Sequence, residues 1–128
     1  MNSGVLFVSP YPQDARSLAQ MLGDVSLPLI HALSLKEAAS KLETDNFQVV
    51  LTEATLEDGT WLDVLQLALS LDTELVVTHP WADARFWAEA INLGAYDLLA
   101  QPFSGTEVQR VLSSASSRKS TVKAHAAA

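Results

Sequence analysis

The stretch VVLTEATLEDG, residues 49–59, begins as an unbroken apolar run and ends in a cluster of acidic residues. Its first residues, read together with those just before them, predict a buried strand over 47–52. Glu53 follows that strand directly, so we expect its carboxylate at the strand's carboxyl end. In open α/β sheets this is the edge at which ligands bind.

Similar apolar runs recur along the chain and alternate with segments of helical periodicity. The runs predict strands over 4–9, 27–33, 47–52, 74–79 and 96–102. The periodic segments predict helices over 14–23, 34–42, 60–71, 82–94 and 104–115. Pro28 favours an edge position for the second strand. Five strands alternating with five helices predict an α/β fold, in which a parallel sheet is covered on both faces.

Composition and charge exclude several classes of protein. A chain of 128 residues suits one domain, and it has neither an apolar stretch long enough to span a membrane nor a recognisable secretory signal. Because cysteine is also absent, we expect a cytoplasmic protein. Residues 1–116 hold five basic and fifteen acidic groups, so this part is not expected to bind nucleic acid.

The last residues differ in composition from the rest. Residues 117–128 are rich in Ser, Lys and Ala and lack periodicity, so we expect a domain over 1–116 followed by a flexible tail or linker. In a longer chain such a linker would lead into an effector domain.

Polar residues follow several of the predicted strands. The candidate site residues at these strand ends are Ser9, Pro10, Glu53, Thr78, His79 and Gln101. The chain has no glycine-rich phosphate loop, and its histidines lack metal-ligand spacing, so we expect no metal and no cofactor. A small hydrolase built on Ser9, His79 and Glu53 is a weaker alternative, because nothing resembles a nucleophile elbow.

Residues 4–115 resemble the response-regulator receiver family, the CheY-like superfamily. VLFVSPYPQD (5–14) resembles the family's first strand and the loop after it, and VVLTEATLEDG resembles the strand that carries the phospho-accepting aspartate. LGAYDLLAQPF (93–103) resembles the segment G-A-x-x-Y-L-x-K-P-F. The resemblance implies a three-layer, doubly wound sheet of order 2-1-3-4-5, flavodoxin-like, and a role in two-component (phosphorelay) signalling.

The family's active residues are not present at the matching positions. Ser9 and Pro10 stand where the family has two acids that help to hold Mg²⁺, and Glu53 stands where it has the accepting aspartate. Gln101 replaces the lysine, and Leu98 replaces the switch aromatic. The switch hydroxyl is Thr78, or His79 if the loop carries no insertion. These departures indicate a pseudo-receiver that is not an enzyme.

Two alternatives concern the acidic side chains. A phospho-accepting receiver would use Glu53 or Asp58 as an atypical acceptor, although Asp58 reads more simply as a solvated turn or helix-cap acid. Glu53 is either a permanent mimic of a charged state or a polar residue at a strand end. In both cases we expect Gln101 to donate a hydrogen bond to Glu53 in place of the lysine.

The helix predicted over 82–94 has an excess of aromatic residues. If Ala84, Ala88 and Ile91 form its core stripe, Phe86 and Trp87 are exposed and form an apolar patch with Trp81. Alternatively, the helix is rotated and buries one or two of these rings. The resemblance implies signalling through the face of the fourth helix, fifth strand and fifth helix. The candidate interface for a protein partner or a second copy is therefore Trp81, Phe86, Trp87 and Leu98.

Overall fold

The computed structural model of the chain describes residues 4–127, and the side chains of residues 4–118. Five parallel strands form the main sheet: β1 (Val5–Val8), β2 (Leu29–Ala32), β3 (Val49–Glu53), β6 (Glu74–His79) and β7 (Asp97–Ala100). The helices are α1 (Pro12–Gly23), α2 (Leu35–Thr44), α3 (Trp61–Ser70), α4 (Ala84–Leu93) and α5 (Gly105–Ala127). The strand order is β2-β1-β3-β6-β7, which confirms the predicted order and the edge position of the second strand.

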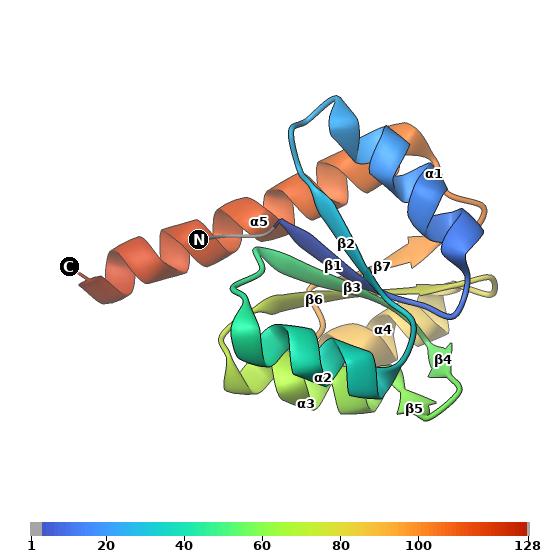
Figure 1. Ribbon diagram of the computed structural model, residues 1–128, viewed down its shortest axis with the longest axis horizontal. Coiled ribbons are helices and arrows are strands. Elements are labelled where there is room, and N and C mark those ends of the chain that lie inside the picture. The colour runs from blue at the N-terminus through green and yellow to red at the C-terminus, as the bar shows by residue number, and fades with distance from the viewer. Residues whose placement is uncertain (1–3, 128) are drawn as a thin grey trace.

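The sheet is the middle layer of three, with α1 and α5 on one face and α2, α3 and α4 on the other (Figure 1). Each face has its own apolar core. Phe7, Leu51 and Val76 pack toward α1 and α5, whereas Leu6, Val50 and Val77 pack toward α2, α3 and α4. Neighbouring strand residues alternate between the two cores, so the strands are buried on both faces and read as continuous apolar runs.

Side-chain caps fix where the helices α2, α3 and α4 begin. Ser34 accepts a hydrogen bond from the Glu37 amide at the start of α2. Thr60 and Asp63 form a complete capping box at the start of α3. Asp83 accepts from the Phe86 amide, so α4 begins at Ala84 and not at residue 82 as predicted.

The orientation of α4 follows the second of the two predicted alternatives, in which the helix is rotated and buries one of the rings. Ala84 and Ala88 are exposed, so the predicted core stripe is wrong, and the buried residue of the helix is Ala90. Phe86 lies on the inward side, with its ring centroid 5.9 Å from that of Trp61 and 5.5 Å from that of His79. Burying a phenyl ring removes far more apolar surface from water than burying a methyl group, which favours this rotation.

Two further elements differ from the prediction. A short antiparallel hairpin of β4 (Thr55–Leu56) and β5 (Gly59–Thr60) occupies the loop after β3. The last helix continues to Ala127 instead of ending at residue 115, and Figure 1 shows its final turns projecting beyond the sheet. The domain boundary at residue 116 stays a prediction.

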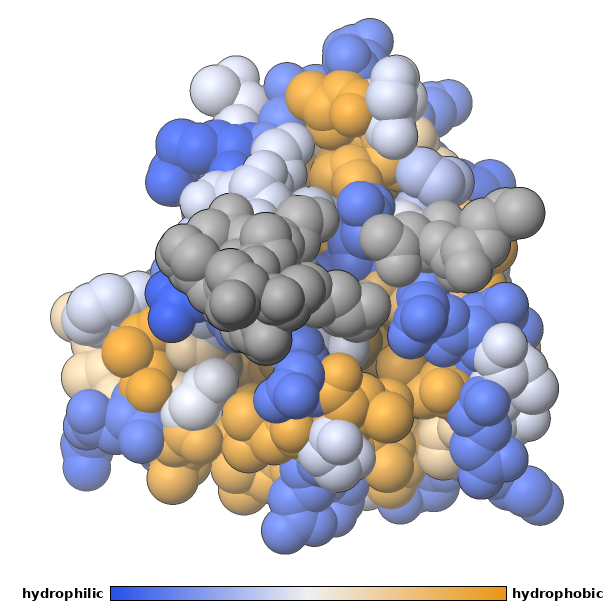
Figure 2. All heavy atoms as spheres, turned by 90° about the vertical axis from the view of Figure 1, so that its left-hand side faces the viewer, coloured by the Kyte–Doolittle hydropathy of each residue, from blue (hydrophilic) through white to orange (hydrophobic). Residues whose placement is uncertain are grey.

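The end of the molecule from which α5 projects carries exposed apolar side chains. In Figure 2 they gather in the half that holds α2 and α3. A shallow cavity of about 200 Å³ lies there between the two helices and is lined in part by Leu42, Leu67 and Leu71. None of the helices described over residues 4–127 is long and apolar enough to cross a membrane.

Candidate functional site

Three strands bring the candidate site together at their carboxyl ends. Glu53, the last residue of β3, is in register with Thr78 on β6. Thr78 is in turn in register with Leu99 on β7, two residues before Gln101. Residues far apart in the sequence therefore meet because parallel strands end at the same edge of the sheet.

The Gln101 amide connects the other two side chains. Its Nε2 lies 3.1 Å from Glu53 Oε1, 3.2 Å from Glu53 Oε2 and 3.1 Å from Thr78 Oγ1, and donates to all three. The Thr78 hydroxyl donates to the Leu99 carbonyl at 3.0 Å. The hydrogen bond predicted from Gln101 to Glu53 is thus confirmed. Since Gln101 carries no charge, Glu53 has a polar partner but, among the described side chains, no cation.

Glu53 is only 5% exposed, and this burial governs its protonation. Desolvation raises the pKa of Glu53 to about 7 from an ordinary 4.5. The hydrogen bond from Gln101 opposes this rise in pKa, while the negative charge of Asp14 adds to it. The side chain therefore exchanges its proton near neutral pH.

Thr78, and not His79, lies beside Glu53 and Gln101. Thr78 is fully buried and hydrogen bonded to Gln101. The His79 ring packs against Phe86, and its Nδ1 accepts a hydrogen bond from the Trp81 amide at 3.0 Å.

Ser9 belongs to the turn between β1 and α1. Its hydroxyl is buried and accepts from the Tyr11 amide at 3.1 Å, and its carbonyl accepts from His31 Nε2 at 2.7 Å. Within the described residues, Ser9 makes no hydrogen bond to His79 or Glu53. The arrangement that a hydrolase would need is therefore not assembled. Pro10 is partly exposed and supplies no side-chain ligand.

The side chains at this edge do not match a magnesium site. Among the side chains that the structure describes, those of residues 4–118, no group of three or more histidine or acidic residues is placed to hold a metal ion. The carboxylates of the site are Glu53 and, from the first turn of α1, Asp14. Mg²⁺ demands near-ideal octahedral oxygen coordination, and Pro10 contributes no side-chain oxygen to it.

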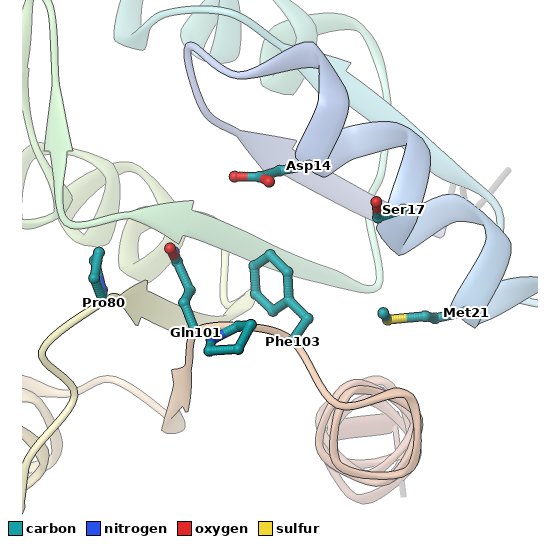
Figure 3. A pocket seen from close by; sticks show the side chains of 7 residues that line it. Asp14, Ser17, Met21, Pro80, Gln101 and Phe103 are labelled. Carbon is teal, nitrogen blue, oxygen red and sulfur yellow. The ribbon is translucent and has the colours of Figure 1, made fainter.

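A cavity of about 500 Å³ opens next to the site (Figure 3). Its walls come from α1, from Pro80 after β6 and from the segment after β7; the α1 residues are Asp14, Ser17 and Met21, and the last segment contributes Gln101, Pro102 and Phe103. The sequence interpretation missed Asp14 and Phe103 as site residues. The one available signal was the position of Asp14, a few residues beyond the first strand end.

Asp58 has a structural role as a helix cap. Its carboxylate accepts hydrogen bonds from the amides of Leu35 at 2.8 Å and Lys36 at 3.0 Å, at the start of α2. These bonds hold the pKa of Asp58 below its ordinary value. The interpretation of Asp58 as a helix-cap acid is confirmed, although the helix that it caps is α2.

The candidate interface is smaller than predicted. Trp81 is 78% exposed and Trp87 is 49% exposed. Leu98 is only 8% exposed because it packs into the core below α4, and Phe86 is partly buried in the same core. Neither belongs to an exposed patch. Trp87 Nε1 donates to Asp97 Oδ1 at 3.1 Å, which holds this ring against the start of β7.

Solved structures provide the comparison with known proteins. No family model and no curated protein matches the sequence. The signal receiver domain of a putative Luxo repressor protein from Vibrio parahaemolyticus matches with a TM-score of 0.86 and 19% identity, over 96% of each chain. The receiver domain of Francisella response regulator 1452 matches with a TM-score of 0.81 and 18% identity, over 91% of this chain and 98% of the other.

A third similar structure is the beryllofluoride-activated NtrC4 receiver domain dimer. Its TM-score is 0.81 at 24% identity, over 90% of this chain and 97% of the other. These likenesses cover nearly the whole domain, and together with the strand order they establish its architecture. The chain has the fold of the response-regulator receiver domains.

Proposed function

We propose that this chain is a pseudo-receiver, a non-catalytic signalling module of a two-component or phosphorelay system. It acts through protein–protein contacts without accepting a phosphoryl group. The observation that carries the proposal is the hydrogen-bonded set of Glu53, Gln101 and Thr78. A neutral amide here holds a buried carboxylate, at the position where the resemblance implies a lysine beside an aspartyl phosphate.

Charge argues against phosphoryl transfer at this site. Transfer needs cations that neutralise the phosphoryl oxygens, and it needs the acceptor to be well positioned. Glu53 places its carboxylate about 1.5 Å further out than an aspartate would. Its charged neighbour, Asp14, is negative. An incoming phosphoryl group would therefore meet repulsion where the family supplies attraction.

The partner surface proposed here includes Trp81 and Trp87. Exposed tryptophans are favoured at protein interfaces, because a large rigid ring buries much area at low entropic cost. Trp87 belongs to α4 and Trp81 to the loop before it, and the resemblance implies contacts through the face that includes this helix. A protein partner or a second copy, a cytoplasmic location and an effector domain in a longer chain are parts of the same proposal.

The alternative is a receiver that accepts phosphate on Glu53 or Asp58. The alternative requires Asp58 to leave the amides of Leu35 and Lys36, or Glu53 to bind Mg²⁺ without the acidic pair. We regard it as the less supported function.

Beryllofluoride with Mg²⁺, a stable mimic of an acyl phosphate, tests the proposal by ¹H–¹⁵N NMR. We expect the amide resonances of Glu53, Thr78 and Gln101 to stay unchanged as the two are added together. Saturable shifts at these residues that require both components would support the phospho-accepting alternative. A receiver domain with the family's complete acidic site serves as the positive control.

A further inference from the structure

Two of the side chains that line the cavity beside the site, Asp14 and Gln101, accept hydrogen bonds. Asp14 points its carboxylate from α1 into the opening, and the Gln101 side chain rises from the opposite wall (Figure 3). Gln101 directs its nitrogen to Glu53 and Thr78, which leaves its amide oxygen as an acceptor. Within the described residues, the Asp14 carboxylate has no hydrogen bond or ion pair. A ligand that pairs with these two acceptors must therefore carry hydrogen-bond donors.

The carboxyl groups in and near the cavity favour a positively charged ligand. Asp14 lines the cavity, and its charge interacts with that of Glu53, the hydrogen-bond partner of the lining residue Gln101. Around Glu53, the neighbouring elements contribute Thr78 from β6 and Gln101 after β7, neither of which carries a charge. The whole chain carries a net charge of −7, which favours the approach of cations.

The remaining walls are apolar and aromatic. Phe103 stands between Gln101 and α1 with its ring toward the cavity, and Met21 lies at the outer end (Figure 3). A phenyl face attracts a planar cation that stacks on it. Ser17 adds a hydroxyl on the α1 wall.

We propose that this cavity binds a guanidinium group, with Asp14 and the Gln101 oxygen accepting its N–H bonds and Phe103 stacking on its plane. Guanidinium fits because it offers five donors and no acceptor, pairs with a carboxylate through two parallel bonds and stacks on aromatic rings. The group belongs either to a free small guanidine or to an arginine of a protein partner. The inference rests on the proposed function in one respect, since it takes Glu53 as unmodified.

The test is an NMR titration with two probes, ethylguanidinium and N-acetyl-arginine methylamide, at constant ionic strength. We expect saturable shifts at the amides of Asp14, Ser17, Gln101 and Phe103, with a dissociation constant on the order of millimolar for such small ligands. Tighter binding of the arginine derivative identifies a protein partner as the source. Equal or weaker binding identifies a free small guanidine.

Variants distinguish binding in the cavity from a general effect of the protein's charge. Asp14→Asn should weaken binding at least about tenfold, the loss of one charge-assisted contact, and Phe103→Leu should weaken it by a smaller factor. Glu89→Gln removes the same charge from the exposed face of α4 and should leave binding unchanged. Affinity should also rise with pH through about 7, because the cation favours ionised Glu53.

Some results would overturn the inference. One is the absence of saturable shifts with either probe at concentrations of tens of millimolar. Another is an equal response of the Glu89→Gln and Asp14→Asn variants, and a third is displacement of both probes by equimolar Mg²⁺. Intact mass, measured before the titration, verifies that Glu53 is unmodified, so a negative titration is distinct from failure of the pseudo-receiver proposal.

Discussion

At the scale of single residues, Glu53 is a carboxylate that the sheet buries without a cation. The side-chain nitrogen of Gln101 lies 3.1 and 3.2 Å from the two carboxylate oxygens of Glu53. Burial nevertheless outweighs this hydrogen bonding and raises the pKa of Glu53 to about 7. Ionisation of the folded protein near neutral pH therefore costs free energy that the unfolded chain, in water, does not have to supply.

The first prediction concerns the pH dependence of stability. Because the folded pKa exceeds the ordinary value of 4.5, the stabilising effect of the Glu53 proton is complete below pH 4.5 and is lost as the pH rises through about 7. Glu53→Gln cannot ionise. We expect its free energy of unfolding, relative to that of the wild type, to increase by about 2–3 kcal/mol between pH 4.5 and pH 8.

Urea denaturation at several pH values measures this difference. Glu89→Gln, on the exposed face of α4, is the matched control and should show little change relative to the wild type. A constant difference between Glu53→Gln and the wild type across the range would show that Glu53 has an ordinary pKa.

At the scale of elements, the β4–β5 hairpin holds the start of α2. Asp58, in the turn of the hairpin, accepts from the amides of Leu35 and Lys36. These amides belong to the first turn of the helix and have no partner within it. A carboxylate at a helix N-terminus also interacts favourably with the helix dipole.

The second prediction tests this cap. Asp58→Ala should lower the melting temperature and speed hydrogen exchange at the amides of Leu35 and Lys36, while Asp58→Asn should have a smaller effect. Glu57→Ala removes a neighbouring exposed carboxylate and is the control. Because the pKa of Asp58 is lowered, the contribution of the cap should be present above pH 3.8 and should disappear as the pH falls through its folded pKa. Unchanged exchange at both amides in Asp58→Ala would contradict the cap.

The same elements show what the sequence can and cannot predict. Continuous apolar runs such as the one ending at Glu53 predict buried parallel strands, and parallel strands place their carboxyl ends together, so the contact between Glu53 and Gln101 was predictable. The choice between the two orientations of α4 was not predictable, because alanine and aromatic residues alternate around that helix and only packing against Trp61 and His79 selects Phe86. The hairpin was missed because each strand has only two residues.

The cavity depends on tertiary structure in the same way. Asp14 and Phe103 come together only when α1 and the segment after β7 pack at one end of the sheet. No local pattern joins two residues that lie so far apart in the sequence.

At the scale of the whole molecule, the first part of α5 covers the sheet and its last part extends beyond the sheet. Val111, Leu112 and Ala115 are buried against the face shared with α1, whereas the final turns project beyond the sheet in Figure 1. Arg118 pairs with Glu74 at 3.9 Å and lies over the Tyr96 ring. These contacts hold α5 against the sheet as far as Arg118.

The third prediction follows from this division of α5. Deletion of residues 119–128 should change the free energy of unfolding by less than about 0.5 kcal/mol, since Val111, Leu112 and Ala115 remain packed against the sheet. Deletion from Val111 onward removes Leu112, whose loss alone is expected to cost about 2–5 kcal/mol, and should unfold the domain. Circular dichroism during urea denaturation distinguishes the two. Marked destabilisation by the shorter deletion would place the domain boundary further along the chain.

The central claim, a receiver fold that does not accept phosphate, is tested most directly by intact mass after incubation with acetyl phosphate and Mg²⁺. A variant that carries the family's residues, Ser9→Asp, Pro10→Asp, Glu53→Asp and Gln101→Lys, accompanies the wild type, and an ordinary receiver domain verifies the donor. We predict that the wild type gains no phosphoryl group under conditions in which the ordinary receiver gains one. A phosphoryl adduct on the wild type, located at Glu53 or Asp58, would contradict the claim.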